Sequence, residues 1–377
     1  MTLPDDDVLK DPPEEPVVRW MERPPAAYGP TVVVGALTGA FMLGMITTLA
    51  AVALMAGSAL ASEPAGKGYE FGVIAKSQSN PVFQAARTGA MDAAADLSKK
   101  YGLDIKIRWQ TPVNEDAQQQ AQYIQLLASQ GVDGIAVSCT DANVLTKAID
   151  EAVDKGVQVV TFDSDAPKSK RFAYYGIDDV EAGKKLMQEL AKAMGGKGGK
   201  IAILAGNQSA PNLQARVKGV KDEIEKMKDK GFTLKEVYYH EETPAKAAAK
   251  VQEVQTANPD VAGWAMVGGW PLFTKGALEG VADKAKVAAV DALPEQIEYV
   301  KAGQVQALVV QDCYGWGYKS VEMLFDKVHN GKNPEKVINA FELKVCGKEN
   351  AKEYEGLWKK WLGKKDEKKD EKKEDKK

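Results

Sequence analysis

Histidine and cysteine are scarce in this chain. Its 377 residues include 2 His and 3 Cys, and the cysteines form no CxxC pair and no metal-ligand spacing, so neither a zinc site nor a redox dithiol is predicted. Cys313 and Cys346 fit either a disulfide in an oxidising compartment or two buried free thiols. Neither His240 nor His329 lies near a predicted strand end with a nucleophile, and GxSxG and HExxH motifs are absent. We therefore predict no enzyme, no catalytic residue, no metal site and no cofactor.

The chain also lacks a strong excess of one charge. It has 50 Lys and Arg against 53 Asp and Glu, a formal net charge of -3, so a general basic surface for nucleic acid is not predicted. Its one glycine-rich run, at residues 195–200, follows a predicted helix and precedes a predicted strand, the wrong order for a phosphate-binding loop. Hydrophobic residues make up 44% of the chain, enough for more than one packed core.

The N-terminal region divides into two segments. Residues 1–30 are rich in proline and acidic residues and are predicted to be disordered. Residues 31–61 contain no charge and are long enough to cross a bilayer as a helix. The small residues at Ala59 and Ala61 fit a signal peptide, whereas the length of the apolar run fits a retained membrane anchor. Because Arg19 precedes this run, both interpretations place the rest of the chain in the periplasm or on the outer face of the cytoplasmic membrane.

Between residues 68 and 363, short β-branched runs alternate with amphipathic helical stretches. This order predicts an α/β fold with parallel sheets covered by helices on both faces. The charged run KKDEKKDEKKEDKK at residues 364–377 contains no apolar residue and is predicted to be a disordered, solvated tail. The predicted strands are 71–75, 103–109, 134–138, 158–163, 173–177, 200–205, 234–239, 263–267, 287–291 and 306–310.

Polar and aromatic residues follow most of these strands. Parallel α/β sheets bind ligands at the carboxyl ends of their strands, so this edge is where a site is expected. The segments found there are 76–80, 139–141, 163–165, 206–208, 268–270, 291–292 and 311–312. Together they supply carboxylates, amides and an indole, which suits a small polar ligand.

At these strand ends the body resembles the type I periplasmic binding proteins, in particular the ribose-like sugar-binding branch. The segments that carry the resemblance are SNPVF at 79–83, VVTFDSD at 159–165, NLQARVKG at 212–219, AAVDALPEQ at 288–296 and VVQDCYGWGYKSVEML at 309–324. The resemblance implies two doubly wound parallel-sheet lobes joined by a three-segment hinge. Mapped here, the lobes are 68–177 with 311–334, and 178–310 with 335–347, followed by a C-terminal helix at 348–363.

The resemblance also implies which side chains hold the ligand. Val82 stands where the family has an aromatic residue, Ser164 where an arginine often follows the aspartate, and Trp270 where asparagine is frequent. These departures favour a sugar other than ribose, or a related polyol. The predicted ligand-binding residues are Asn80, Phe83, Asp163, Asp165, Asn212, Arg216, Trp270, Asp291 and Gln311.

These residue types suit a sugar, because carboxylates accept hydroxyl hydrogen bonds, arginine donates, amides do both and aromatic rings cover CH faces. Each also fits a structural role. Phe83 and Trp270 can be ordinary hydrophobic packing, Asp163 and Asp291 can cap helices, and Arg216 can pair with a glutamate on its own helix.

The prediction for function is an extracytoplasmic solute-binding protein that captures a monosaccharide or polyol in an interlobe cleft. The resemblance implies delivery to an ABC permease, a monomeric state, and attachment to the membrane through the N-terminal helix if that helix is uncleaved. The alternative is a sensor component that presents a sugar-like signal to a chemoreceptor or kinase. A transcription regulator of the same architecture would carry a helix-turn-helix where residues 31–61 stand.

Overall fold

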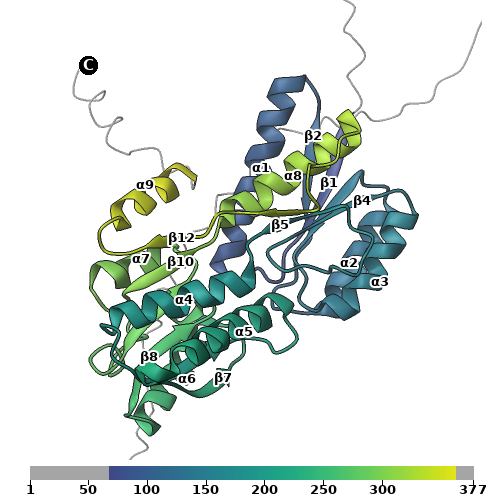
Figure 1. Cartoon of the computed structure of the whole chain (residues 1–377). Helices are drawn as coiled ribbons and strands as arrows, with labels where there is room; N and C mark the ends of the chain where they lie inside the picture. Colours follow the sequence, from purple (N-terminus) through teal and green to yellow (C-terminus); the bar gives the residue numbers. More distant parts are fainter. Residues whose placement is uncertain (1–67, 362–377) are drawn as a thin grey trace, which may run out of the picture. The chain divides into compact units, whose positions relative to one another are not determined.

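The structure is a computed structural model that describes residues 68–361 (Figure 1). The predicted disordered segment at 1–30, the signal or anchor helix at 31–61 and the charged tail at 364–377 lie outside these residues. Within 68–361, every helix is too short or too polar to be a candidate membrane span.

Two six-stranded sheets form the body of the protein. The strand order is β11-β5-β4-β3-β1-β2 in the first sheet and β12-β10-β9-β8-β6-β7 in the second. The strands of the first sheet are β1 (Tyr69–Ile74), β2 (Ile105–Trp109), β3 (Gly134–Val137), β4 (Gln158–Phe162), β5 (Ala173–Gly176) and β11 (Ile338–Ala340). Those of the second are β6 (Gly199–Ala205), β7 (Phe232–Tyr239), β8 (Val261–Met266), β9 (Lys286–Val290), β10 (Ala307–Val310) and β12 (Lys344–Cys346). The equivalent orders make the two halves structural repeats, in which β4 corresponds to β9.

All strand pairs are parallel except β10 with β12, which is antiparallel. The predicted strands overlap β1 to β10, and the predicted parallel α/β fold class is confirmed.

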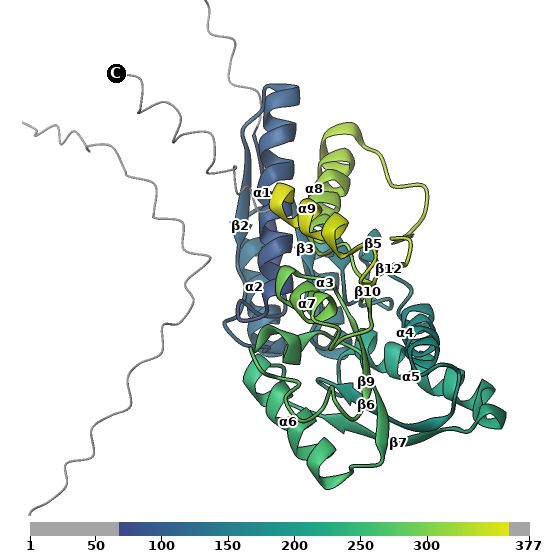
Figure 2. The ribbon, with the colours of Figure 1, turned by 90° about the vertical axis from the view of Figure 1, so that its left-hand side faces the viewer.

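Helices cover both faces of each sheet. On the first sheet, α1 (Pro81–Tyr101) and α8 (Cys313–Asn330) lie side by side although they are far apart in sequence (Figures 1 and 2). The other helices are α2 (Ala117–Ser129), α3 (Ala142–Asp154), α4 (Asp179–Ala193), α5 (Pro211–Lys226), α6 (Pro244–Ala257), α7 (Pro294–Lys301) and α9 (Ala351–Trp361), with short 3-10 helices at Lys228–Lys230 and Trp270–Phe273.

The pleat of the strands separates these helix layers. In β3, Ile135 packs with α2 and α3, whereas Ala136 packs with α1 and α8. In β6, Ile203 packs with α4 and α5, whereas Leu204 packs with α6 and α7. Successive residues point to opposite faces, so apolar strands buried on both sides require helices on both sides.

The chain passes between the two halves at three places, after β5, after β10 and between β11 and β12. We call the first sheet with α1, α2, α3 and α8 the first lobe, and the second sheet with the remaining helices the second lobe. The boundary predicted at 334/335 differs from the structure, because β11 pairs with β5 and so belongs to the first lobe. Because β11 belongs to the first sheet and β12 to the second, the third crossing lies between them, at residues 341–343.

All three cysteines are buried and free. Cys313 opens α8 and Cys346 ends β12. The sequence left open a disulfide between Cys313 and Cys346 or two buried free thiols, and the structure contains the free thiols.

Candidate ligand-binding site

Two aspartates occupy equivalent positions at the carboxyl edges of the two sheets. Asp163 follows β4 and Asp291 follows β9, and both have positive φ values, 55° and 92°. Non-glycine residues rarely adopt this backbone conformation because it costs free energy. Where the surrounding structure enforces it, the residue is often part of a functional site. Neither residue caps a helix, so the structural role considered for them is not observed.

Asp163 lies where the first lobe meets the second. Its side chain is buried, with 4% of the residue exposed. Oδ2 accepts a hydrogen bond from the hydroxyl of Ser138 at 2.7 Å, and Oδ1 accepts one from the amide of Asn212 at 3.2 Å. Nη2 of Arg216 lies 3.9 Å from Oδ1. One carboxylate of the first lobe is thus held by two side chains of α5.

Arg216 is the central cation of the site and is 2% exposed. Its Nε donates to Asp179 at 2.8 Å, and its Nη2 donates to Gln311 at 2.8 Å. Nη1 donates to the carbonyl of Val267 at 3.0 Å. Burial raises the pKa of Asp179 to about 7, although the guanidinium opposes this rise. Arg216 therefore pairs across to α4 rather than with Glu223 of its own helix.

Close packing of α4 against α5 fixes this pair. A Cβ atom on Gly183 would lie 2.0 Å from the carbonyl oxygen of Arg216, and one on Gly219 would lie 2.0 Å from that of Val180. Both distances are far below contact, so only glycine fits at these positions. The two helix backbones can approach each other because both side chains are absent, and this brings Arg216 to Asp179.

Gln311 joins the arginine to the second aspartate. Its Nε2 donates to Asp291 at 2.6 Å, and the backbone N–H of Gly269 donates to the other oxygen of Asp291 at 3.2 Å. Burial raises the pKa of Asp291, and Arg216 opposes the rise. Because Gln311 lies in the crossing after β10, it combines a hinge position with a position in the site.

Aromatic rings line the same cavity. Phe83 lies tilted against Trp316, with ring centroids 6.0 Å apart, and Trp270 meets the edge of His240 at 5.0 Å. Phe83 and Trp270 also belong to hydrophobic clusters, so packing and cavity lining coincide. The indole N–H groups of Trp270 and Trp316 are buried and have no hydrogen-bond partner within residues 68–361. Each is a donor that a ligand oxygen would satisfy.

A cavity of about 30 Å³ lies between these groups. That volume accommodates about one water molecule, which is much smaller than a monosaccharide. The predicted residues that line it are Asn80, Phe83, Asp163, Asn212, Arg216, Trp270, Asp291 and Gln311. The structure therefore brings nearly the whole predicted set together in a closed arrangement.

Asp165 is the predicted site residue that does not line this cavity. Both of its carboxylate oxygens accept hydrogen bonds from Arg171 at 2.6 Å, and Thr161 donates a third at 2.6 Å. In an extended segment, residues two apart such as Asp163 and Asp165 lie on one face. The positive φ of Asp163 ends that alternation and turns Asp165 away.

Two charged residues in the site were not among the predicted ones. Lys76 is 2% exposed and donates to Asn212 at 3.3 Å. Burial alone would lower the pKa of Lys76, but the carboxylates of Glu115, Asp163 and Glu242 raise it above its ordinary value. Lys76 follows β1 and lies in the strand-end segment 76–80, but it was not chosen as a ligand-binding residue. Glu242 follows β7, and the end of that strand was not among the segments considered.

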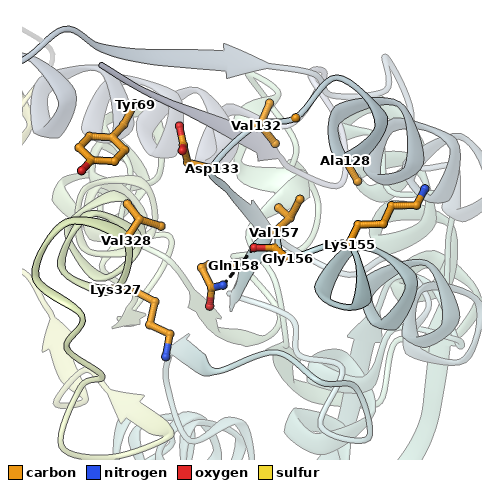
Figure 3. Close-up of a pocket in the computed structure, with 11 residues that line it drawn as sticks. Tyr69, Ala128, Val132, Asp133, Lys155, Gly156, Val157, Gln158, Lys327 and Val328 are labelled. Carbon is orange, nitrogen blue, oxygen red and sulfur yellow. Dashed lines mark hydrogen bonds between the residues drawn. The ribbon is translucent and has the colours of Figure 1, made fainter. Parts of the chain in front are cut away.

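A larger pocket of about 490 Å³ lies at the opposite edge of the first sheet (Figure 3). Tyr69 and Gln158 begin β1 and β4 there, and Lys155 and Lys327 stand at its rim. No predicted site residue lines it. Within the described chain, no group of three or more His, Cys, Asp or Glu is arranged to hold a metal ion.

The family model for the periplasmic binding protein domain matches residues 71–333. The chain is 25% identical over 275 residues to the D-allose-binding periplasmic protein of Escherichia coli (strain K12), covering 70% of this chain and 86% of that protein. It is 26% identical over 277 residues to a ribose import binding protein of Bacillus subtilis (strain 168), covering 73% and 86%. An ABC transporter solute-binding protein from Burkholderia graminis, solved in complex with D-arabinose, is 29% identical, with a TM-score of 0.67 over 76% of this chain and 98% of that one.

Proposed function

Since the chain belongs to the periplasmic binding protein domain family, we propose that it captures a monosaccharide or related polyol between its lobes and delivers it to an ABC importer. The observation that carries this proposal is the convergence of Asp163 and Asp291 on one cavity with Arg216. The relatives are named for allose and ribose binding, and one similar structure holds D-arabinose. Those names favour import over sensing.

The polar groups of the cavity match the surface of a sugar. In the closed structure they hydrogen-bond one another, as Gln311 does with Asp291 and Arg216. A sugar hydroxyl can replace each partner, because it both donates and accepts. The unpartnered indole donors of Trp270 and Trp316 add two places for ligand oxygens. These side chains need no reaction step, and binding is the chemistry they perform.

Ligand entry requires the lobes to separate. A cavity of about 30 Å³ does not hold a sugar ring, whereas the three crossings supply the short links about which lobes can rotate. A ligand that bridges Asp163 of the first lobe to Arg216 and Asp291 of the second favours closure, since only the closed form makes all of those bonds. Closure in turn presents a surface that a permease can distinguish from the open form. We place this cycle in the periplasm.

Thermal unfolding of the full chain across pentoses, hexoses and polyols, with amino acids and nucleosides as controls, tests the proposal. A ligand at about 100 times its dissociation constant adds about 2.7 kcal/mol of stability. A shift with one sugar class is expected. A response confined to an amino acid or nucleoside would keep the fold and overturn the sugar.

The Asp291→Asn variant tests the site. Loss of one or more charged hydrogen bonds, each about 1.5–3 kcal/mol, should weaken affinity for the sugar roughly tenfold to a hundredfold. The matched control is Asp283→Asn, which removes the same charge from an exposed position of the second lobe. Equal affinity in the wild type and in Asp291→Asn would refute the assignment of this site.

A further inference from the structure

A second compartment of about 340 Å³ adjoins the central cavity. Glu242 lines both spaces, so the two are separated by that side chain. The groups around the second compartment include Asn114, Glu115, Asn207 and His240. The central cavity is lined by the predicted ligand-binding residues other than Asp165, and none of the predicted residues lines this second space.

Two carboxyl groups from different lobes meet at the compartment. Glu115 lies in the loop after β2 and Glu242 in the loop after β7. The charge of Glu242 acts on Glu115, and the backbone N–H of Asn207 donates to Glu242 at 2.7 Å. Oε2 of Glu115 is buried and has no hydrogen-bond partner among residues 68–361. Burial raises the pKa of Glu115 well above its ordinary value, and Glu242 adds to the rise while Lys76 opposes it.

Carboxyl groups outnumber cations throughout the joined site. The buried cations are Lys76 and Arg216. The carboxyl groups whose charges act on them are Glu115, Glu242, Asp163, Asp179 and Asp291. His240 adds no compensating charge at neutral pH, because burial lowers its pKa and Lys250 assists, although the carbonyl of Glu241 and the charge of Glu242 oppose this. An anionic ligand would increase the excess of negative charge, a neutral one would leave it, and a cation would reduce it.

His240 supplies an independent indication of a donor on the ligand. Its Nδ1 lies 2.6 Å from the backbone carbonyl oxygen of Glu241, which can only accept, so Nδ1 carries the proton. Nε2 is therefore a bare acceptor, and it is buried with no partner among the described residues. Its ring contacts Trp270, a side chain that is 4% exposed and whose own N–H lacks an acceptor in the same part of the chain. The compartment thus offers hydrogen-bond acceptors, including Nε2 of His240, to a donor group on the ligand. The indole N–H of Trp270 beside it can donate to a ligand hydroxyl.

We propose that this compartment receives a primary ammonium group, so that the captured solute is an amino sugar. The inference rests on the proposed function and specifies its ligand. An ammonium offers three N–H donors, which match the carboxylates of Glu115 and Glu242 and Nε2 of His240. When R–NH₃⁺ binds, the proton that the raised pKa keeps on Glu115 leaves to solvent and the ammonium takes its place beside the carboxylate. Binding of the amine therefore releases about one proton.

Isothermal titration of the full chain tests this assignment. The probes are D-glucosamine, D-galactosamine and D-mannosamine, each beside its neutral parent sugar, with D-glucuronate as the anionic probe. Titrations at neutral pH in two buffers of different ionisation enthalpy count the protons released. We expect one amino sugar to bind at least about tenfold more tightly than its parent, with release on the order of one proton.

Charge-neutral variants locate the effect. Glu242→Gln and Glu115→Gln should each reduce the preference for the amine about tenfold or more, and Glu115→Gln should also abolish proton release. Glu236→Gln is the matched control, because it removes the same charge from an exposed position on β7, and it should leave both readouts unchanged.

The outcomes separate the inference from the function beneath it. A neutral parent sugar that binds as tightly as its amine, or tighter binding of D-glucuronate, would overturn the amino-sugar assignment and keep the sugar-binding function. A preference that survives in both glutamine variants would also overturn it. Binding of no sugar in either set would refute the proposed function itself.

Discussion

Replacing Arg216 with methionine removes the buried charge on which the site depends, while it keeps an unbranched aliphatic stem. The guanidinium donates three hydrogen bonds, to Asp179, Gln311 and the carbonyl of Val267. The guanidinium also lies 3.9 Å from the carboxylate of Asp163, and removing one partner of such a buried pair costs about 3–5 kcal/mol because the other charge is left uncompensated. We expect a loss of about 3 kcal/mol in the free energy of unfolding at low pH, and more at high pH.

The pH dependence follows from Asp179. Its pKa rises from 3.8 to about 7 on folding, and an acid with a raised pKa weakens the folded state as pH rises between these values. Arg216 opposes this rise, so its removal raises the folded pKa further and extends the loss of stability above pH 7. Near pH 5.5 Asp179 is protonated in both proteins. Near pH 8.5 it is ionised in the wild type and less so in the variant, which adds up to about 2 kcal/mol to the deficit of the variant.

Urea unfolding at both pH values measures this difference. The control is Arg87→Met on the exposed side of α1, where the guanidinium lies over Trp109 at 5.9 Å, and it should cost less than about 1 kcal/mol at either pH. Equal deficits for Arg216→Met at the two pH values, or a deficit no larger than that of the control, would show that the guanidinium does not compensate Asp179.

Three further predictions concern packing and chemistry around the site. Asp165→Asn should lower the free energy of unfolding by about 2–4 kcal/mol because Arg171 loses its buried partner, and denaturant unfolding that shows no loss would contradict the ion pair. Gly183→Ala should lower the free energy of unfolding by about 1–3 kcal/mol and weaken sugar binding, since its Cβ collides with the backbone of α5. The control is Gly356→Ala in α9, whose Cβ meets open space, and it should leave the free energy of unfolding unchanged or raise it by up to about 1 kcal/mol. The three buried thiols should resist a thiol reagent at mildly alkaline pH, because burial raises the pKa of each; fast labelling of the native chain would contradict their burial, and all three should react after unfolding without a reductant.

Much of the fold follows from local sequence patterns. Apolar β-branched runs separated by amphipathic stretches predicted β1 to β10, since parallel strands buried on both faces are apolar throughout. The short strands β11 and β12 have only three residues each, too few to show a period. Their assignment to different sheets depends on partners far away in sequence, so the lobe boundary at 335 was predicted incorrectly.

The candidate site was predictable where strand ends determine it. Asp163 and Asp291 end equivalent strands, so the strand-end rule places both at the carboxyl edge. Arg216 and Asn212 lie one turn apart on α5, and it was the resemblance to the sugar-binding branch that assigned them to the site. Asp165 was misplaced because a single positive φ at Asp163 reverses the direction of the following residues. Nothing in the local sequence marks that angle, which is a property of the folded edge.

By itself, the sequence determined the alternating architecture and the set of polar side chains at the carboxyl edge, because both depend on periodicity and position along each strand. Only the tertiary structure decided which charges face one another. Glu115 and Glu242 lie on different lobes, and their mutual electrostatic effect and the effect of both carboxyl groups on Lys76 exist only once the lobes meet. Electrostatic coupling depends on distance in space and on exclusion of water, and neither is set by distance along the chain.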